Sequence, residues 1–328
     1  MRRFRWIFPT AALGLLGASS LPALAGPVDP ARHWPWPPAE LERRLAEDRL
    51  EILESFDGVG GVMGVKKLKL RVGDAGDLLF VKWKKAPNGD ADGWNNTPRK
   101  EIAAYEIQKW FLDPENYVVP TIVARCIRLD VYTALDPRTR ANLAGARCVM
   151  GALVVWIDHV TVPDTLYDPE RFANDPLYAR HLADFNVFAY LIKHEDGRKG
   201  NFLVSKFEQD RRIFSIDNGV AFDARVKNWF VPNWHKIRVP RLRKETVARL
   251  RAVGPEQLAA LGVVAELRAD AEGVMRPVPH AANARPSKGS RARPGWLQLG
   301  LDDDEIEHVA KRLAQLLAKT DTGEIATY

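Results

Sequence analysis

Two short segments in the second half of the chain carry the side chains whose spacing best suits chemistry. The first is His194-Glu-Asp196, followed by Asn201 five residues after the aspartate. The second is Asp217-Asn-Gly, at the end of an expected hairpin. A carboxylate such as Asp196 can orient or deprotonate an attacking hydroxyl, whereas amide and carboxylate oxygens suit hard divalent cations. The set predicts phosphoryl transfer, with Asp196 at the nucleophile and Asn201 and Asp217 at the metal.

Phosphoryl transfer also needs a cation on the phosphates and a group that holds this cation. The strand expected over residues 78–83 leads into two lysines, of which Lys82 is our first choice to face a phosphate and Lys84 the reserve. Glu101 lies on a helix expected over residues 97–112, on the side away from its apolar stripe. It could pair with Lys82 or simply face water, and a lone strand lysine is more often solvated than functional.

Four glycines, Gly58, Gly60, Gly61 and Gly64, lie between the first two expected strands. Glycine lets a hairpin backbone approach a phosphate closely and offer its N–H groups. We therefore expect this loop to cover the phosphates of a nucleotide. The alternative is a plain tight turn, for which such sequences are also common.

The pattern around these segments predicts an α+β fold with two lobes. A β-rich N-lobe over residues 50–160 would contain one long helix and bind the nucleotide. Its strands are expected at residues 51–56, 65–72, 78–83, 121–132 and 147–157. A mainly helical C-lobe over residues 161–328 would carry the catalytic and metal loops, and a helix with Tyr178 and Leu182 on its buried stripe. Residues 276–294 hold five basic residues and no acid, which predicts a flexible surface insertion.

Residues 1–25 have the pattern of an export signal. Three arginines precede an apolar run over residues 6–18, and Ala23-Leu-Ala is a small-x-small cleavage site. The run is shorter than the ~20 residues of a transmembrane helix. We expect cleavage before Gly26, a periplasmic or secreted protein, and no membrane span afterwards; an uncleaved anchor is the alternative. A Pro-rich lead-in with a short helix would follow over residues 26–49.

Composition and cysteine content limit the remaining functions. With 46% hydrophobic and 27% charged residues, the chain is neither wholly disordered nor a polytopic membrane protein. The net charge of +6 includes three leader arginines, so the rest carries only +3, too little to predict nucleic acid as a partner. Cys126 and Cys148 could form a disulfide in an oxidising compartment or remain two buried thiols. Neither has neighbours at zinc-site spacing.

At these residues the chain resembles the atypical secretory-pathway kinases, the group that includes four-jointed and the Golgi casein kinase. It is more distantly similar to phosphoinositide-kinase-like and aminoglycoside-phosphotransferase-like proteins. The resemblance covers roughly residues 50–225. It rests on Phe80-Val-Lys82, Glu101-Ile-Ala-Ala-Tyr105 with Val118-Val-Pro120, Asp184-Phe-Asn-Val-Phe188, and Ile216-Asp-Asn-Gly-Val-Ala-Phe222. In that family the helix glutamate pairs with the strand lysine and the Asp-Asn-Gly segment binds metal, which implies these roles for Glu101 and Asp217.

Two departures from the family concern the catalytic loop. Asp196-Gly-Arg replaces the usual Asp-Arg-His. Asn201 stands where the family often has an acid, and this asparagine makes the expected metal site more similar to that of ordinary kinases. Residues and resemblance together predict an exported phosphotransferase that moves the γ-phosphate of ATP, with Mg²⁺ or Mn²⁺, to a hydroxyl of a protein, glycan or small molecule. The alternative is a pseudokinase that acts as an exported binding or scaffold module, because a bacterial periplasm is not expected to hold ATP.

Overall fold

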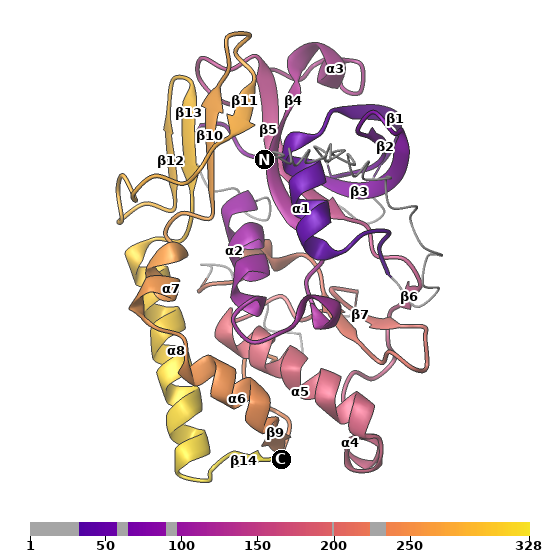
Figure 1. Ribbon diagram of the computed structural model, residues 1–328, viewed down its shortest axis with the longest axis vertical. Helices are drawn as coiled ribbons and strands as arrows, with labels where there is room; N and C mark the ends of the chain where they lie inside the picture. Colours follow the sequence, from indigo (N-terminus) through magenta and orange to yellow (C-terminus); the bar gives the residue numbers. More distant parts are fainter. Residues whose placement is uncertain (1–32, 58–64, 90–96, 199, 224–233) are drawn as a thin grey trace, which may run out of the picture. The chain divides into compact units, whose positions relative to one another are not determined.

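The structure, a computed structural model, describes residues 33–57, 65–89, 97–198, 200–223 and 234–328 (Figure 1). The expected export signal and the glycines Gly58, Gly60, Gly61 and Gly64 lie outside the described residues. The secondary structure confirms the α+β class, with one large antiparallel sheet in the first half and helices with smaller sheets in the second.

A five-stranded antiparallel sheet forms the centre of the first half. Its order is β1 (Leu50–Asp57), β2 (Lys66–Val72), β3 (Asp77–Lys85), β5 (Cys148–Val155) and β4 (Ile122–Arg128). The last expected strand residues, up to Tyr132, instead belong to a short helix, α3 (Leu129–Thr133). Because side chains alternate along a strand, Val81 and Trp83 share one face of β3, and Lys82 and Lys84 share the other.

The two faces of this sheet carry different helices. On the Trp83 face, α1 (Pro38–Glu47) adds Leu41 and Leu45 to an apolar cluster with Leu70 and Leu153. On the lysine face lies α2 (Pro98–Gln108), which contacts β4 and β5. Within α2 only Glu106 is not buried. The sequence predicted one buried apolar stripe, whereas the helix is buried on nearly all sides. Such a helix must satisfy its charged side chains internally.

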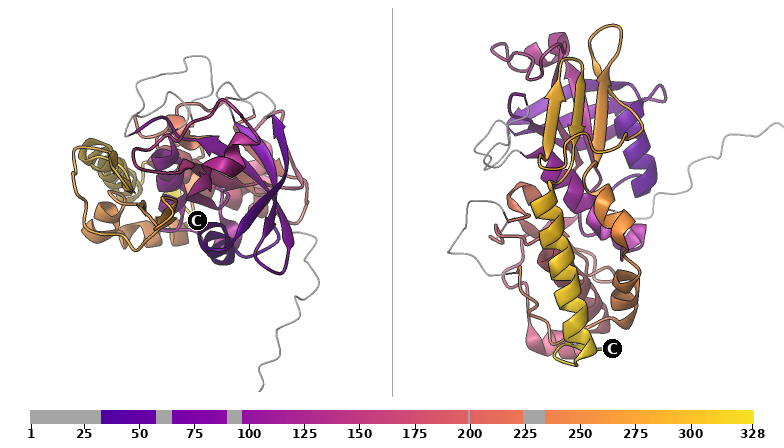
Figure 2. Two further views of the ribbon diagram at one scale, coloured as in Figure 1. Left: turned by 90° about the horizontal axis from the view of Figure 1, so that it is seen from above. Right: turned by 90° about the vertical axis from the view of Figure 1, so that its left-hand side faces the viewer.

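The helical half begins with α4 (Pro169–Asn174) and α5 (Pro176–Leu191). A hairpin of β7 (Phe202–Ser205) and β8 (Ile213–Ser215), joined by β6 (Val160–Thr161), follows α5. The later elements are α6 (Lys244–Arg251), α7 (Pro255–Ala260) and α8 (Asp303–Asp321), with β9 (Arg241–Leu242) paired in parallel to β14 (Ala326–Thr327). The α8 helix packs against α5, α6 and α7 (Figure 2). Asp302 and Glu305 form the capping box that starts it.

The segment 276–294 is not the flexible insertion expected from its composition. It supplies both edge strands, β11 (Met275–Pro277) and β12 (Ser290–Arg293), of a four-stranded sheet with β10 (Ala265–Ala269) and β13 (Trp296–Leu299). Its connecting loop is held by buried acceptors on the inner strands. Ala281 N donates to Glu266 at 2.8 Å and Ala284 N donates to Gln298 at 3.1 Å. These acceptors lie outside the segment, so its own composition could not reveal the order.

The cysteine pairing that the sequence left open is a disulfide between Cys126 on β4 and Cys148 on β5. The Met275 amide donates to Cys148 Sγ at 3.3 Å, which ties β11 to the five-stranded sheet. A disulfide is typical of an oxidising compartment. Within the described ranges, every helix is too short or too polar to cross a bilayer.

The buried histidines of the α5 region predict a pH-dependent stability. Burial lowers the pKa of His181 and of His194 to about 4. In the unfolded chain the pKa of each histidine returns to about 6.5. Between about pH 6.5 and about pH 4 the unfolded state therefore binds more protons than the folded state, and the folded protein loses stability as pH falls. For His194 alone, the loss between pH 7 and pH 5 is roughly 2 kcal/mol. Urea unfolding of His194→Leu should show a pH dependence weaker by that amount.

The exposed His280 provides the matched control, because His280→Leu removes a histidine without removing a buried one. An unchanged pH dependence in His194→Leu, or an equal change in His280→Leu, would contradict the assignment.

Candidate active site

A buried ion cluster joins the five-stranded sheet to α2. Lys84, on β3, pairs with Glu101 of α2 and donates to Asp217 Oδ1 at 2.6 Å. Lys84 and Glu101 are each 1% exposed. Burial alone would lower the pKa of Lys84, but the two carboxylates outweigh it and raise the value. The cluster therefore holds a permanent positive charge beside Asp217.

The structure places Lys84, and not the first choice Lys82, against Glu101. Alternation along β3 puts both lysines on the same face, so the sequence pattern could not distinguish them. Lys82 lies two residues nearer the start of the strand, with its Nζ 3.7 Å from Asp217 Oδ2. Burial, followed by the neighbouring charge of Lys84, lowers the pKa of Lys82. The choice between the lysines is thus made by the position of α2.

Glu101 also positions the segment that carries Asp217. Its Oε2 accepts a hydrogen bond from the Asn218 amide at 3.1 Å, and Ser215 Oγ donates to Asn218 Oδ1 at 2.7 Å. Asp217 itself has a left-handed backbone, with φ of 65°, between β8 and the 3₁₀ turn η2 (Asn218–Val220). This conformation is uncommon for a residue with a side chain and is tolerated best by aspartate and asparagine. A strained backbone beside an ion cluster is typical of functional sites.

Asp196 and Asn201 lie together at the other side of Asp217. Asn201 Nδ2 donates to the Asp196 carbonyl oxygen at 2.8 Å and to its Oδ2 at 2.9 Å. Arg198 connects the two aspartates, since its Nε is 3.3 Å from Asp196 Oδ2 and its Nη2 is 4.0 Å from Asp217 Oδ2. Asp196, Asn201 and Asp217, which are separated by up to 21 residues in the sequence, thus share one site.

Three cations surround Asp217, and two of them also pair with the carboxylates Glu101 and Asp196. Burial would raise the pKa of Asp217, but Lys84 and Lys82 outweigh it and hold the pKa far below its ordinary range. The carboxylate is therefore ionised at any physiological pH. Its Oδ1 faces Lys84, and its Oδ2 faces Lys82 and Arg198.

The oxygens of this site suit a divalent cation that is shared with phosphates. Because Asn201 Nδ2 bonds to Asp196, the Asn201 Oδ1 oxygen is oriented away from that contact, 3.4 Å from Arg198 Nε. Mg²⁺ typically takes one or two carboxylate or amide oxygens and fills its other positions with phosphate oxygens and water. Within the described ranges no group of three or more His, Cys, Asp or Glu side chains is arranged to hold a metal. Asp217 and Asn201 instead fit a cation site with one carboxylate oxygen and one amide oxygen, whose other positions phosphate oxygens and water would fill.

Several positioning residues were not identified from the sequence. Arg198 stands between the aspartates, and Asn218 joins Glu101 to the segment that carries Asp217. Lys100 Nζ donates to the carbonyl oxygen of Ala221 at 2.9 Å and pairs with Glu305 of α8 at 3.0 Å. Each of these bonds links residues more than 100 positions apart or depends on a turn conformation, neither of which a local pattern reveals.

Asp184, which belongs to one of the resemblance motifs, lies outside this site. It bonds to Arg243 at 2.7 Å and to Thr246 Oγ1 at 2.6 Å, and so joins α5 to the start of α6. Trp234 packs against α5, buried with its ring centroid 5.6 Å from that of Phe185.

Comparisons with known proteins support the same class of fold. No protein-family model matches the chain, and no curated protein does. The structure of hydra Fam20 with sugar is 14% identical, with a TM-score of 0.52 over 88% of this chain and 91% of that one. Structures of the Golgi casein kinase, one of them with Mn/ADP bound, are 13% identical, with TM-scores of 0.48 and 0.46. They cover 88% and 86% of this chain and 78% and 75% of theirs.

The chain therefore has a kinase-like fold, as the sequence predicted. Within that class, the resemblance to the atypical secretory-pathway kinases is confirmed at the level of the fold by the likeness to hydra Fam20.

The two lysines can be distinguished by stability. Lys84→Met leaves Glu101 buried without its cation, a change that costs roughly 3 to 5 kcal/mol in comparable buried pairs. Lys82→Met should cost less than about 1 kcal/mol, because the Lys82 side chain is partly solvated and its pairing is long. Chemical unfolding of both variants in the absence of nucleotide measures the difference. Equal losses, or a larger loss for Lys82→Met, would contradict the placement of Lys84.

Proposed function

We propose that the protein is an exported, kinase-like phosphotransferase that moves the γ-phosphate of ATP to a hydroxyl of a protein, glycan or small molecule. The observation that carries the proposal is the convergence of Lys84, Glu101, Asp196, Asn201 and Asp217 on one site of a kinase-like fold. The set contains one cation for the phosphates, a carboxylate that holds this cation, a carboxylate for the nucleophile and two oxygen ligands for a metal ion, which are parts that phosphoryl transfer uses.

Each group has a role that follows from its position. Lys84, held by Glu101, would neutralise the phosphates, and Lys82 on the same face would add a second positive charge. Asp217 and Asn201 would hold Mg²⁺ or Mn²⁺, which neutralises charge on the phosphates when bound. Asp196 would accept the proton of the acceptor hydroxyl as its oxygen bonds to the γ-phosphorus. The bond from that phosphorus to the bridging oxygen breaks, and ADP leaves.

Support for the nucleotide and the metal also comes from the neighbouring structures, one of which is described with Mn/ADP bound. The glycines Gly58, Gly60, Gly61 and Gly64 remain our candidates for the loop over the phosphates. In this proposal residues 50–160 bind the nucleotide, and residues 161–328 carry the catalytic and metal loops.

Export is supported by the Cys126–Cys148 disulfide together with the signal-like residues 1–25. The proposal is a periplasmic or secreted protein without a membrane span after cleavage, and no nucleic acid partner.

The second candidate is a pseudokinase, in which the fold binds a partner without catalysis. Three cations already surround Asp217 and could replace a metal, which favours this candidate. They are Lys82, Lys84 and Arg198. The two candidates differ in whether phosphate is transferred.

Two isosteric variants test the proposal. In the wild type, Mn²⁺ with ADP should raise the melting temperature, because a ligand of the native state stabilises it. Asp217→Asn should lose this shift. Asp196→Asn should keep the shift but lose at least about a hundredfold in transfer of labelled phosphate from ATP, since general base catalysis contributes about 10²–10⁴-fold.

Asp321→Asn, at the exposed end of α8, is the matched control and should leave both measurements unchanged. A shift that survives in Asp217→Asn would remove the metal assignment. Binding without any transfer in the wild type would favour the pseudokinase.

A further inference from the structure

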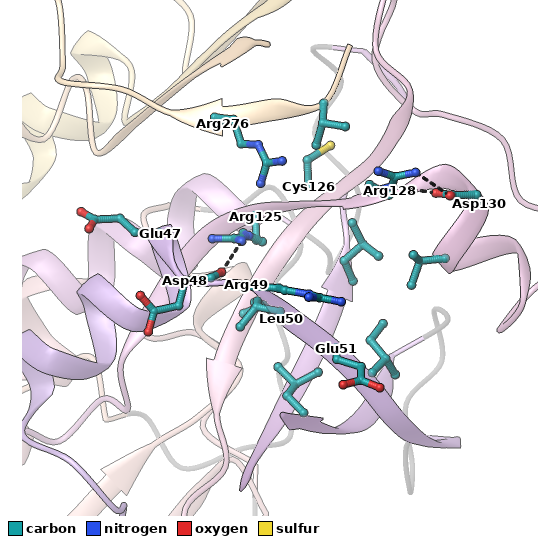
Figure 3. Close-up of a pocket in the computed structure, with 16 residues that line it drawn as sticks. Glu47, Asp48, Arg49, Leu50, Glu51, Arg125, Cys126, Arg128, Asp130 and Arg276 are labelled. Carbon is teal, nitrogen blue, oxygen red and sulfur yellow. Dashed lines mark hydrogen bonds and ion pairs between the residues drawn. The ribbon is translucent and has the colours of Figure 1, made fainter. Parts of the chain in front are cut away.

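A cavity lies away from the proposed nucleotide site. It has a volume of about 660 Å³ and is bounded by β1, β4, the end of α1 and β11 (Figure 3). Its apolar lining includes Leu70 on β2 and Leu153 on β5. Both belong to the Trp83 face of the sheet, whereas Lys84 lies on the opposite face. The sheet therefore separates this cavity from the ion cluster.

The cavity has an apolar floor and a charged rim with equal numbers of arginines and carboxylates. The floor consists of seven aliphatic side chains, Leu50, Ile52, Leu70, Ile127, Val131, Leu153 and Val274. The rim carries four arginines, Arg49, Arg125, Arg128 and Arg276. Ligand cavities commonly have volumes of about 300–1,000 Å³, with a mostly apolar lining and a few convergent polar groups.

Arg125 is the arginine of the rim that is buried and held in place by hydrogen bonds. It is 6% exposed and donates to the carbonyl oxygens of Leu45, at 2.9 Å, and Asp48, at 2.8 Å, at the end of α1. A third bond goes to the Ala46 carbonyl oxygen. Five N–H groups are present on a guanidinium, so its Nε and one Nη2 hydrogen remain for another acceptor. The helix end thus fixes a buried cation at the edge of an apolar cavity.

Arg276 faces Arg125 across the rim. Figure 3 shows the Arg276 guanidinium pointing toward that of Arg125, with Asp48 and Glu47 farther along α1. Burial, together with this neighbouring positive charge, lowers the pKa of Arg125 to about 10. Arg276 is paired through its Nε with Asp270 at 2.9 Å, so its Nη groups remain as donors for a ligand.

Most carboxylates of the lining are already paired. Asp130 bonds to Arg128, Glu51 to Arg71 and Asp48 to Arg43. Arg49, by contrast, has no carboxylate within ion-pair distance in the described part of the chain. Arg276 has its own carboxylate partner in Asp270. In the described part of the chain, the positive charge without a carboxylate partner is therefore that of Arg49 and Arg125. The acids around them favour a singly charged ligand over a more highly charged one.

We propose that this cavity binds an amphipathic carboxylate, with its acid group between Arg125 and Arg276 and its aliphatic body on the floor formed by Leu70, Leu153 and their neighbours. Arginine forks match a carboxylate with two parallel hydrogen bonds. The aliphatic body would cover the half-buried Leu50, Ile52 and Ile127 and the exposed Val131, while Leu70 and Leu153 are already buried beneath them. The site is independent of the proposed phosphotransferase site, from which the sheet separates it.

Dodecanoate below its micelle concentration is the probe, and isothermal titration calorimetry on the full chain is the measurement. Saturable binding is expected. Dodecanol, which lacks the charge, and acetate, which lacks the body, should each bind at least about tenfold more weakly. Arg276→Glu should weaken dodecanoate by at least about tenfold. Arg293→Glu, on the neighbouring edge strand β12, makes the same charge change outside the cavity and should have no effect.

Arg276→Gln repeats the test without a new negative charge, in case Arg276→Glu unfolds; the melting temperature without ligand checks this. The proposal is overturned by any of four results. These are no saturable binding by the wild type, equal binding of dodecanol, unchanged binding by a folded Arg276 variant, or displacement of dodecanoate by Mn²⁺ with ADP. The last result would place the probe in the nucleotide site instead.

Discussion

The burial of Lys84 is the constraint on which the rest of this structure depends. A lysine that is 1% exposed is stable only with carboxylates at hydrogen-bond distance, and it has two, Glu101 and Asp217. One comes from α2 and the other from the segment after β8. The sheet, the helix and the metal segment must therefore meet at one point, or the charge is left unpaired.

Hydrogen bonds and ion pairs from several elements hold the residues around Lys84 in place. Glu101 uses its second oxygen for the Asn218 amide, and Lys100 beside it bonds to Ala221 and Glu305. Consecutive residues of α2 thus fix both the segment that carries Asp217 and the long helix α8. This explains why α2 is buried on nearly all sides despite its many charges. A helix with that role cannot be amphipathic in the ordinary sense.

The sequence predicted the elements better than it predicted their contacts. Alternation and turn residues located the strands of the central sheet, and the spacing of Asp196, Asn201 and Asp217 identified side chains that the structure brings together. The lysine could not be chosen, because Lys82 and Lys84 point the same way and only the position of α2 decides between them. Arg198 was missed for a similar reason, since its role depends on two partners that the folded chain brings together.

For the segment 276–294, the sequence predicted less regular structure than the protein has. Its composition is that of a flexible loop, yet its two ends pair with β10 and β13 as the edges of a sheet. Glu266 and Gln298 on these inner strands accept amides of the loop between the ends. Composition measures what a segment can bury by itself, whereas order here is supplied by neighbours. The same sheet contributes Arg276 to the cavity of Figure 3, so the segment expected to be a flexible insertion is part of a candidate binding site.

The central claim is that Asp217 and Asn201 hold the divalent cation of a nucleotide. Anomalous scattering from Mn²⁺, in a crystal of the protein grown with a non-hydrolysable ATP analogue, tests it most directly. The account predicts a manganese peak between these two side chains, with the phosphates beside Lys84. A peak elsewhere, or phosphates that bind without approaching either residue, would contradict it.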